Sequence, residues 1–362
     1  MRDVFVIADN IVSPLGRTTE ENFRALAQDR TAIRLHETYY ASLFDSQPTF
    51  ENLALDSAAP SLRASGLDPA DPRLVFILSS TKGNTGLLEH GVTDPDRISL
   101  AVSAQNVATA LGLVNPPIVV SHACISGLQA MITASRLLKS GVYDHALICG
   151  ADLITNFILS GFQSFQAVSP EPCRPFDADR KGVTLGEAAA SAVLTTARSN
   201  SPIPDGSIRL MGGAVSNDAN HISGPSRTGE ELALAIRRAL TQAGNPDIDF
   251  ISAHGTATVY NDDMEAKAIH LTGLKEVPVG SLKGFFGHTL GAAGLLEAIV
   301  SMQSLRENLI LPTRGYGRPG TVLPVNVLSK PLEKPIRHCL KTASGFGGCN
   351  AAVILEKTKT PI

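Results

Sequence analysis

Short runs of aliphatic residues recur along the chain and are separated by polar or glycine-rich segments. The runs lack the alternation of polar and apolar residues that marks a strand with one face in water. Such runs are typical of β-strands that are covered on both faces. The pattern predicts buried strands at Leu74–Leu78, Ile118–Ser121, Ala146–Cys149, Ala190–Thr195, Ile208–Met211, Phe250–Ala253, Val277–Gly280 and Ala352–Leu355.

Helical patterns fill several of the intervals between these strands. In these intervals apolar residues recur every three or four positions, which is the spacing of a helix with one buried face. Strands that alternate with helices indicate an α/β fold built in layers. The predicted helices are Ile125–Lys139, Gly229–Ala243, Asp263–Leu271 and Ala292–Leu305.

A turn-rich segment, SNSPIPDG at residues 199–206, lies near the middle of the chain. Proline, glycine and serine in such a cluster favour a linker over a regular element. We therefore expect two halves, residues 1–200 and 201–362, each starting with β-structure and continuing with strand–helix units. The polar segment from Tyr40 to Asp71 shows little periodicity and is expected to form surface loops and a short helix.

The composition narrows the function classes. Of 362 residues, 43% are hydrophobic and only 18% are charged, and the net charge is −3. Because charged side chains are costly to bury, so few of them indicate a large buried core rather than a disordered chain. A pI near 6.3 argues against nucleic acid as the main partner.

Residues 99–135 contain no aspartate, glutamate, lysine or arginine. A membrane span needs about 20 mostly apolar residues, but polar residues and two prolines interrupt this stretch. We expect it to form core or subunit interface. The N-terminal residues show no signal-peptide pattern, so the sequence favours a cytoplasmic protein without a membrane segment.

The five cysteines, at positions 124, 149, 173, 339 and 349, are odd in number and have no CxxC spacing. This excludes a disulfide framework and a common type of zinc site, and it fits a reducing compartment.

Cys124 differs from the others in its setting, because a buried strand ends just before it and a helical pattern begins just after it. The amides and dipole at a helix N-terminus stabilise a thiolate, which suits a nucleophilic cysteine. The alternative is a small buried hydrophobic residue, which is the commoner role of cysteine.

Two histidines lie in similar strand-to-loop settings. His254 follows a predicted strand and opens a loop rich in glycine and threonine, and His288 precedes the small-residue segment TLGAAG. A single histidine there would usually be structural, but functional groups gather where the strands of α/β folds end. The glycine loop GFGGCN near the C-terminus matches neither a phosphate loop nor a dinucleotide fingerprint.

Five segments resemble, in family order, the motifs of the condensing β-ketoacyl synthases. They are HACISG at Cys124, CRPFDADRKGVTLGEAAASAVL at Cys173–Leu194, HGTAT at His254, KGFFGHTLGAAG at His288, and GFGGCN at Phe346. The resemblance implies a thiolase-like α/β fold whose duplicated halves form a five-layered α-β-α-β-α core. It also implies a 3-oxoacyl-acyl carrier protein synthase, an acyltransferase of fatty acid or polyene and polyketide-type synthesis.

The resemblance further implies the role of each matching residue. Cys124 would carry the acyl group, and the backbone amides of Cys124 and Phe346 would form the oxyanion hole. Phe346 would also be the gatekeeper of the acyl pocket. His254 and His288 would stabilise the enolate that forms when malonyl-acyl carrier protein loses carbon dioxide.

Four further residues match polar positions of the family. Lys283 and Glu265 would orient the histidines, although a solvated ion pair is the alternative for these two. Thr256 and Thr258 would bind the pantetheine arm. The resemblance implies no cofactor, and a metal site built from His254 with Asp262, Asp263 or Glu265 matches no standard ligand spacing.

The partners implied are acyl carrier protein and a second subunit, either an identical copy or a paralogue in a heterodimer. Two other functions stay open: a non-catalytic chain-length factor, and a coenzyme A-primed thiolase or initiating synthase. Cys124 argues against the first and His288 against the second. The chain also departs from the family by a shorter region between about Arg34 and Asn106, which points to a specialised pathway.

Overall fold

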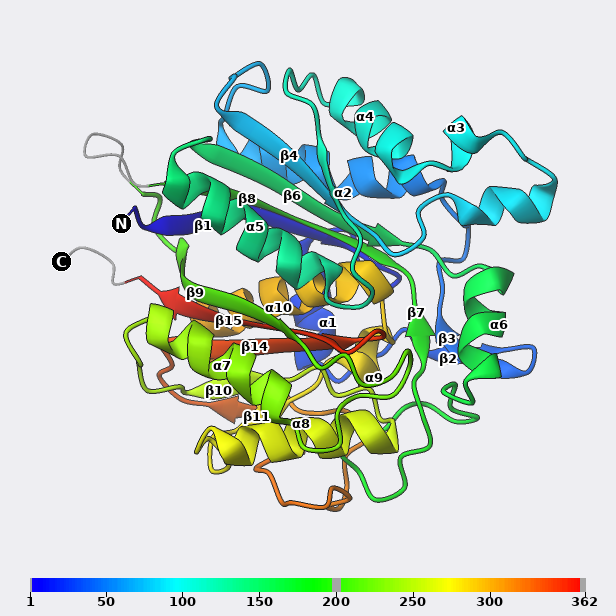
Figure 1. The fold of residues 1–362 in the computed structure, drawn as a ribbon, viewed down its shortest axis with the longest axis vertical. Coiled ribbons are helices and arrows are strands. Elements are labelled where there is room, and N and C mark those ends of the chain that lie inside the picture. The colour runs from blue at the N-terminus through cyan, green and yellow to red at the C-terminus, as the bar shows by residue number, and fades with distance from the viewer. Residues whose placement is uncertain (1, 197–202, 359–362) are drawn as a thin grey trace.

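The computed structural model describes residues 2–196 and 203–358. Ten strands form one continuous sheet in the order β11-β10-β14-β15-β9-β1-β8-β6-β4-β5 (Figure 1). The strands of the first half of the chain are β1 (Val4–Val12), β4 (Leu74–Ser79), β5 (Ile118–Val120), β6 (His145–Asp152) and β8 (Ala188–Thr196). Those of the second half are β9 (Ile208–Asn217), β10 (Phe250–Ser252), β11 (Val279–Gly280), β14 (His338–Gly345) and β15 (Cys349–Lys357).

The two sets of strands repeat one layout. Counted along the chain, each set has the spatial order third, second, fourth, fifth, first. In each set the second strand pairs in parallel with the third and the fourth, and the fifth strand is antiparallel to its neighbours. A short antiparallel pairing of β1 with β9 joins the sets. The duplicated architecture expected from the motifs is therefore confirmed.

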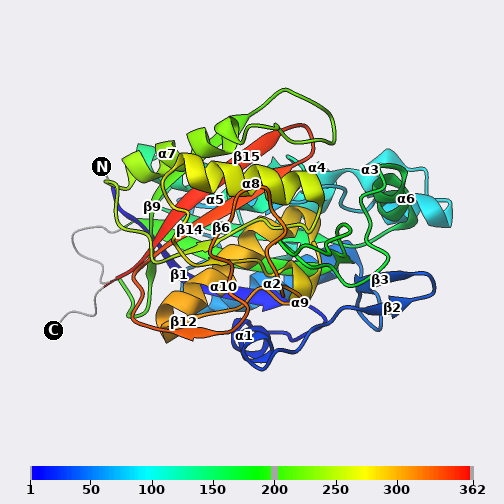
Figure 2. The same ribbon diagram turned by 90° about the horizontal axis from the view of Figure 1, so that it is seen from below.

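Helices form three layers: one lies between the two sets of strands, and one covers the outer face of each set (Figures 1 and 2). Helices α5 (Ser126–Ser140) and α10 (Ala293–Glu307) pack on each other and contact strands of both sets. Helix α2 (Phe50–Ser65), with α4 (Leu100–Ala110), covers the outer face of the first set. Helices α7 (Glu230–Gln242) and α8 (Val259–Leu271) pack on each other, and α7 covers the outer face of the second set.

Glycines bring α5 and α10 into backbone contact. A Cβ on Gly127 would lie 2.6 Å from the amide nitrogen of Leu295, and one on Gly294 would lie 2.8 Å from that of Leu128. Gly294 is the last residue of the small-residue segment TLGAAG that follows His288. A glycine on each helix, Gly127 on α5 and Gly294 on α10, thus allows the short distance between the two helices.

Shorter elements complete the fold. Helix α6 and the 3₁₀ turn η1 lie beside each other at one end of the molecule, and α9 and η2 flank His288. The remaining elements are α1 (Thr19–Ala27), β2 (Arg34–His36), β3 (Tyr39–Ser42), η1 (Thr85–His90), α3 (Pro95–Ile98), α6 (Asn156–Ser164), β7 (Leu185–Gly186), α9 (Lys283–Phe286), η2 (Leu290–Ala292), β12 (Leu309–Ile310) and β13 (Leu332–Glu333).

All eight predicted strands and all four predicted helices are present, with shifted ends. The prediction of surface loops and a short helix between Tyr40 and Asp71 is wrong, because α2 is a 16-residue helix packed on β1 and β8. Its buried residues recur at helical spacing, from Phe50 through Leu53 and Ala54 to Leu62. Strands β1 and β14 were not predicted, since polar residues interrupt both.

Two other expectations concern the boundary between the two halves and the absence of a membrane segment. The boundary between residues 200 and 201 lies outside the described residues, so the division into 1–200 and 201–362 stays a prediction. Within residues 2–196 and 203–358, no helix combines the length and the apolar character that a membrane crossing requires. The five cysteines are all free and buried.

Candidate active site

Cys124 lies in the sharp turn between β5 and α5. The preceding residue, Ala123, has a φ of 45°, in the left-handed region that L-residues rarely adopt. A bridge between His122 and Cys124 closes the turn, and the Ser126 hydroxyl donates to the Ala123 carbonyl at 2.6 Å. The strained turn therefore holds the thiol at the end of the strand, just before the first turn of the helix.

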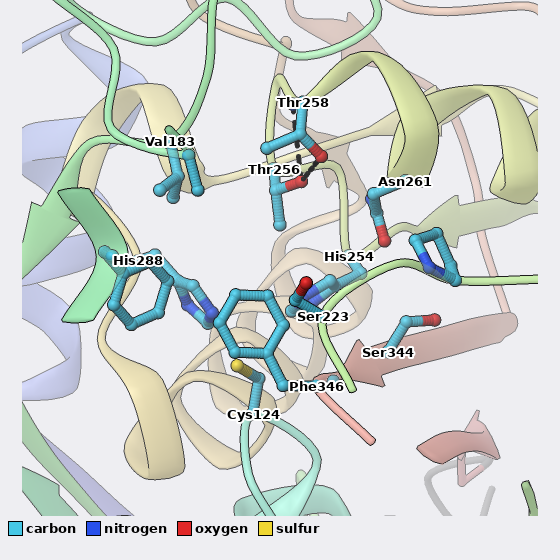
Figure 3. A pocket seen from close by; sticks show the side chains of 14 residues that line it. Cys124, Val183, Ser223, His254, Thr256, Thr258, Asn261, His288, Ser344 and Phe346 are labelled. Carbon is cyan, nitrogen blue, oxygen red and sulfur yellow. Dashed lines mark hydrogen bonds between the residues drawn. The ribbon is translucent and has the colours of Figure 1, made fainter. Parts of the chain in front are cut away.

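The structure brings the two histidines to this thiol. His254 follows β10, and His288 follows α9 just after β11. The Cys124 sulfur and one ring nitrogen from each histidine lie within 4.8 Å of one another. The two imidazole rings are 5.1 Å apart at 84°. Figure 3 shows the three side chains converging in one pocket, so the group expected from separate motifs is assembled.

The thiol is not in the ionisation state that its position in the sequence suggested. Burial raises the pKa of Cys124 to about 12, the neighbouring Cys349 adds to this rise, and Lys283 and the Phe346 backbone amide oppose it. The expected lowering of this pKa by the helix N-terminus is therefore wrong for the protein without substrate, because the loss of water outweighs it. A thiolate here needs a partner to take its proton.

Both imidazoles are neutral for a related reason. Burial lowers the pKa of His254 and of His288 well below the usual value, and the nearby Lys283 lowers both further. Nδ1 of His254 and both ring nitrogens of His288 have no hydrogen-bond partner among the described residues. Buried polar atoms are normally satisfied, so these unpartnered nitrogens mark a place where a polar ligand group can bind.

Lys283 and Glu265 hold the main chain of His254 from opposite sides. The ammonium of Lys283 donates to the His254 carbonyl at 3.0 Å. Glu265 accepts hydrogen bonds from the amides of His254, at 2.9 Å, and of Gly255, at 2.6 Å. Both side chains are buried, at 0% and 1% exposed, which excludes a solvated ion pair.

Two further charged residues of the site were not anticipated. Glu297 of α10 pairs with Lys283 and also with Lys341 of β14, the latter at 2.7 Å. The sequence contained a signal for Glu297, because it is the only acidic or basic residue, apart from His288, between Lys283 and Arg306. Lys341 carried no such signal, since it follows the apolar residues of a strand that was itself not predicted.

Phe346 separates two cavities that meet at the thiol. One, of about 60 Å³, is lined by His254, His288, Thr256 and Thr258. The other, of about 730 Å³, is lined by α6, by residues 81, 82 and 89, and by Leu290. Cys124, Phe162 and Phe346 line both. The rings of Phe162 and Phe346 are stacked at 5.2 Å, so an aromatic pair stands between the two cavities.

The threonines Thr256 and Thr258 lie together in the smaller cavity, with their hydroxyls 2.9 Å apart (Figure 3). Asp262 fixes their loop by accepting from the Thr256 amide at 3.0 Å, and burial raises the pKa of this carboxyl to about 7. The carboxylates of Asp262 and Glu265 are thus occupied by main-chain amides. Their binding to a metal beside His254, which the spacing did not support, would require those bonds to break.

Models of known families match most of the chain. The "Beta-ketoacyl synthase, N-terminal domain" matches residues 45–200, and the "Beta-ketoacyl synthase, C-terminal domain" matches residues 208–317. The chain is 33% identical to nodulation protein E of Rhizobium meliloti over 269 residues, which are 71% of this chain and 66% of that protein. The matched region thus spans slightly less than two thirds of that relative.

Other relatives match over nearly their whole length. A putative polyketide beta-ketoacyl synthase 1 of Streptomyces halstedii is 30% identical, with 98% of both chains covered. The 3-oxoacyl-[acyl-carrier-protein] synthase 2 of Vibrio cholerae is 29% identical, with 98% of this chain and 99% of that protein covered. Among solved structures, the ishigamide ketosynthase/chain length factor superposes with a TM-score of 0.88 at 27% identity, covering 99% of this chain and 100% of that one.

Proposed function

The chain belongs to the β-ketoacyl synthases, and from this premise we propose that it is a catalytically active condensing enzyme that uses the carrier-bound substrates of fatty acid or polyketide-type synthesis. The observation that carries the proposal is the convergence of the Cys124 sulfur with nitrogens of His254 and His288 within 4.8 Å. A nucleophile and two neutral hydrogen-bond donors in one buried site suit an acyl transfer followed by enolate formation.

The first step is transfer of an acyl group from a carrier-protein thioester to Cys124. The sulfur attacks the thioester carbonyl, the carrier thiol leaves, and the thiol proton goes with it. The amides of Cys124 and Phe346 stabilise the oxyanion. In support, the Phe346 backbone is among the groups that lower the pKa of the Cys124 thiol. The acyl chain then occupies the 730 Å³ cavity, with Phe346 as its gate.

The second step uses the opposite cavity. The pantetheine arm of malonyl carrier protein passes Thr256 and Thr258, and its thioester carbonyl accepts hydrogen bonds from His254 and His288. Carbon dioxide leaves, and the histidines stabilise the enolate. Its carbon attacks the acyl-Cys124 carbonyl, and the Cys124 thiolate leaves and takes a proton from water. The products of this step are a β-ketoacyl thioester on the carrier that brought the malonyl group, carbon dioxide and the free Cys124 thiol.

Two observations favour this function over the alternatives. A chain-length factor does not need a nucleophile, whereas Cys124 lies between the cavities with both imidazoles beside it. A coenzyme A-primed initiating synthase carries asparagine in the position that His288 occupies, and a thiolase carries a second cysteine. Here the buried His288 keeps both ring nitrogens unpartnered and facing the pocket.

The test is intact-protein mass spectrometry after incubation with a panel of acyl carrier protein thioesters, followed by peptide mapping. We expect the acyl mass on Cys124, absent in Cys124→Ala and retained in Cys349→Ala, whose buried thiol interacts with Cys124. An adduct on Cys349 alone, or no adduct from any donor on a folded protein, would contradict the proposal and favour a partner subunit.

For the partner we propose a second synthase-like subunit, either a copy of this chain or a paralogue. Strand β5 ends the sheet, and no described strand pairs with its outer edge, although unpaired edges are normally protected. Val114, which precedes β5 by four residues, is exposed, and so are Phe157 and Phe165, which line the large cavity. Sedimentation analysis should give a dimer, and a monomer that still condenses would refute this.

A further inference from the structure

Lys341 is a lysine with no exposure to solvent, in the middle of strand β14. Burying an ammonium group costs several kcal/mol unless it is paired and hydrogen-bonded. Neither its place in a strand nor the reaction proposed above accounts for it, because its charge does not face either cavity. Its contacts therefore need an explanation of their own.

The ammonium donates to three main-chain carbonyls: those of Ser252 at 3.1 Å, Ala253 at 3.2 Å and Thr342 at 2.7 Å. It also lies 2.7 Å from a carboxylate oxygen of Glu297. An ammonium has three protons, so the carbonyls and the carboxylate use all of them. Lys341 therefore has nothing left to offer a substrate and acts through its neighbours.

These neighbours lead directly to His254. Lys341 holds the carbonyls of Ser252 and Ala253, and Lys283 holds the next carbonyl, that of His254 itself. Three consecutive carbonyls at the end of β10 are thus fixed by two lysines. The two lysines are in turn joined by Glu297, which pairs with one through each of its carboxylate oxygens.

Lysine and carboxylate side chains of opposite charge surround the imidazoles of His254 and His288. The charged groups around the pair are Lys283 of α9, Lys341 of β14, Glu297 of α10, and Glu265 with Asp262 of α8. The Cys124 thiol faces the pair from the turn before α5. Thr342, next to Lys341, donates to Glu265 at 3.0 Å. Asp262 is paired with Arg180 at 3.9 Å, so Lys283 and Lys341 balance Glu297 and Glu265. Without Lys341 the cluster would carry one excess negative charge.

We propose that Lys341 is a positioning residue for the malonyl half of the reaction: it fixes the strand end that aims His254 and supplies the cation that balances Glu297. This rests on the proposed function for its kinetic readout. The effect on the imidazoles follows in direction from the structure, because Lys341 is among the charges that lower the pKa of both His254 and His288.

The test compares Lys341→Met with the wild type in malonyl-thioester decarboxylation and in acyl transfer to Cys124. A misplacement of about 1 Å costs about 10²-fold in rate, so we expect kcat for decarboxylation to fall by about that factor. KM and the rate of acyl transfer should change little. In the pH profile of the variant, histidine protonation should begin at a higher pH than in the wild type, because removal of a nearby cation makes both imidazoles easier to protonate.

A second variant separates position from charge. In Lys341→Met/Glu297→Gln the charges balance again, so the shift of the pH profile should disappear. Decarboxylation should stay slow, since no side chain at position 341 holds the carbonyls of Ser252 and Ala253. Lys275→Met, which removes a half-exposed lysine outside the site, should match the wild type. Wild-type kcat and pH profile in Lys341→Met would overturn the proposal.

Two measurements keep the test decisive if a variant fails. Should Lys341→Met not fold, Lys341→Gln keeps a donor without the charge and is scored by the same criteria. In the wild type, NMR signals of His254 and His288 should titrate well below the usual histidine range, because burial, Lys283 and Lys341 all lower their pKa values. Ordinary histidine titration would refute the charge balance. Absence of decarboxylation in the wild type would refute the proposed function instead, while this NMR result would still stand.

Discussion

The α-carbon of Gly127 in α5 faces the backbone of Leu295 in α10 so closely that a methyl group on Gly127 would lie 2.6 Å from the Leu295 amide nitrogen. The helix that begins beside the nucleophile and the helix that follows His288 are therefore in backbone contact. Their spacing therefore contributes to the distance between the Cys124 thiol and the His288 imidazole.

Gly127→Ala should consequently destabilise the protein and impair acyl transfer. Overpacking a tight core contact costs about 1–3 kcal/mol, and the backbone on the other side cannot move aside as a side chain would. Chemical denaturation gives the loss of stability. The control is Gly161→Ala in α6, where a Cβ meets nothing within 4 Å, and stability should be unchanged or higher. Equal stability of the two variants would contradict the contact.

Cys124→Ala should abolish condensation and leave malonyl-thioester decarboxylation measurable. In the proposed reaction the sulfur carries the acyl group, whereas the imidazoles of His254 and His288 stabilise the enolate. Release of carbon dioxide from malonyl carrier protein measures the remaining activity, and Cys149→Ala, far from the pocket in the core beside α2, serves as control. Loss of decarboxylation as well would mean that the thiol does more than carry the acyl chain.

His288→Ala should lower the rate of decarboxylation by about 10²–10³-fold, which is the usual cost of removing one donor to a developing oxyanion. Acylation of Cys124 should persist, and the two readings together separate the half-reactions. His270→Ala, at the end of α8 and bonded to the Pro324 carbonyl, should behave as the wild type. An unchanged rate in His288→Ala would remove the enolate role.

The alkylation rate of Cys124 should rise about tenfold per pH unit from pH 7 to 9, with no plateau. A group with a pKa of about 12 is almost wholly protonated throughout this range, and only the thiolate reacts. Iodoacetamide labelling with peptide mapping gives the rate at this cysteine in Cys349→Ala. A plateau near neutral pH would show that the helix N-terminus outweighs burial, as the sequence first suggested.

The sequence predicted the fold where burial follows side-chain type. Val75, Phe76 and Ile77 are apolar and wholly buried, so a run such as that in β4 was visible from its residues alone. Strand β14 was missed because its burial depends on an ion pair: Lys341 reads as an exposed residue until Glu297 is known to lie opposite it. Such long-range pairing leaves no periodic trace.

For the candidate site, too, the sequence predicted some features and not others. Cys124, His254 and His288 stand in recognisable motifs, and the structure brings them together. The state of the thiol could not be foreseen, because the rise in its pKa comes from how much protein surrounds it and not from the turn on which it stands. Helix α2 was missed for a different reason. Its buried residues from Leu53 to Leu62 recur at helical spacing, but Pro60 inside the segment argued against a helix.

The identical strand order of the two sets places Cys124 and His288 in corresponding positions, each after the third strand of its set. One strand layout, used twice in the chain, thus offers two equivalent positions for functional side chains. In the proposed reaction the nucleophile occupies one position and a group that stabilises charge occupies the other. Since each position belongs to its own set of strands, the side chain at one position can change without a change in the strands that hold the other. A pairing of unlike subunits would repeat this division of labour between chains.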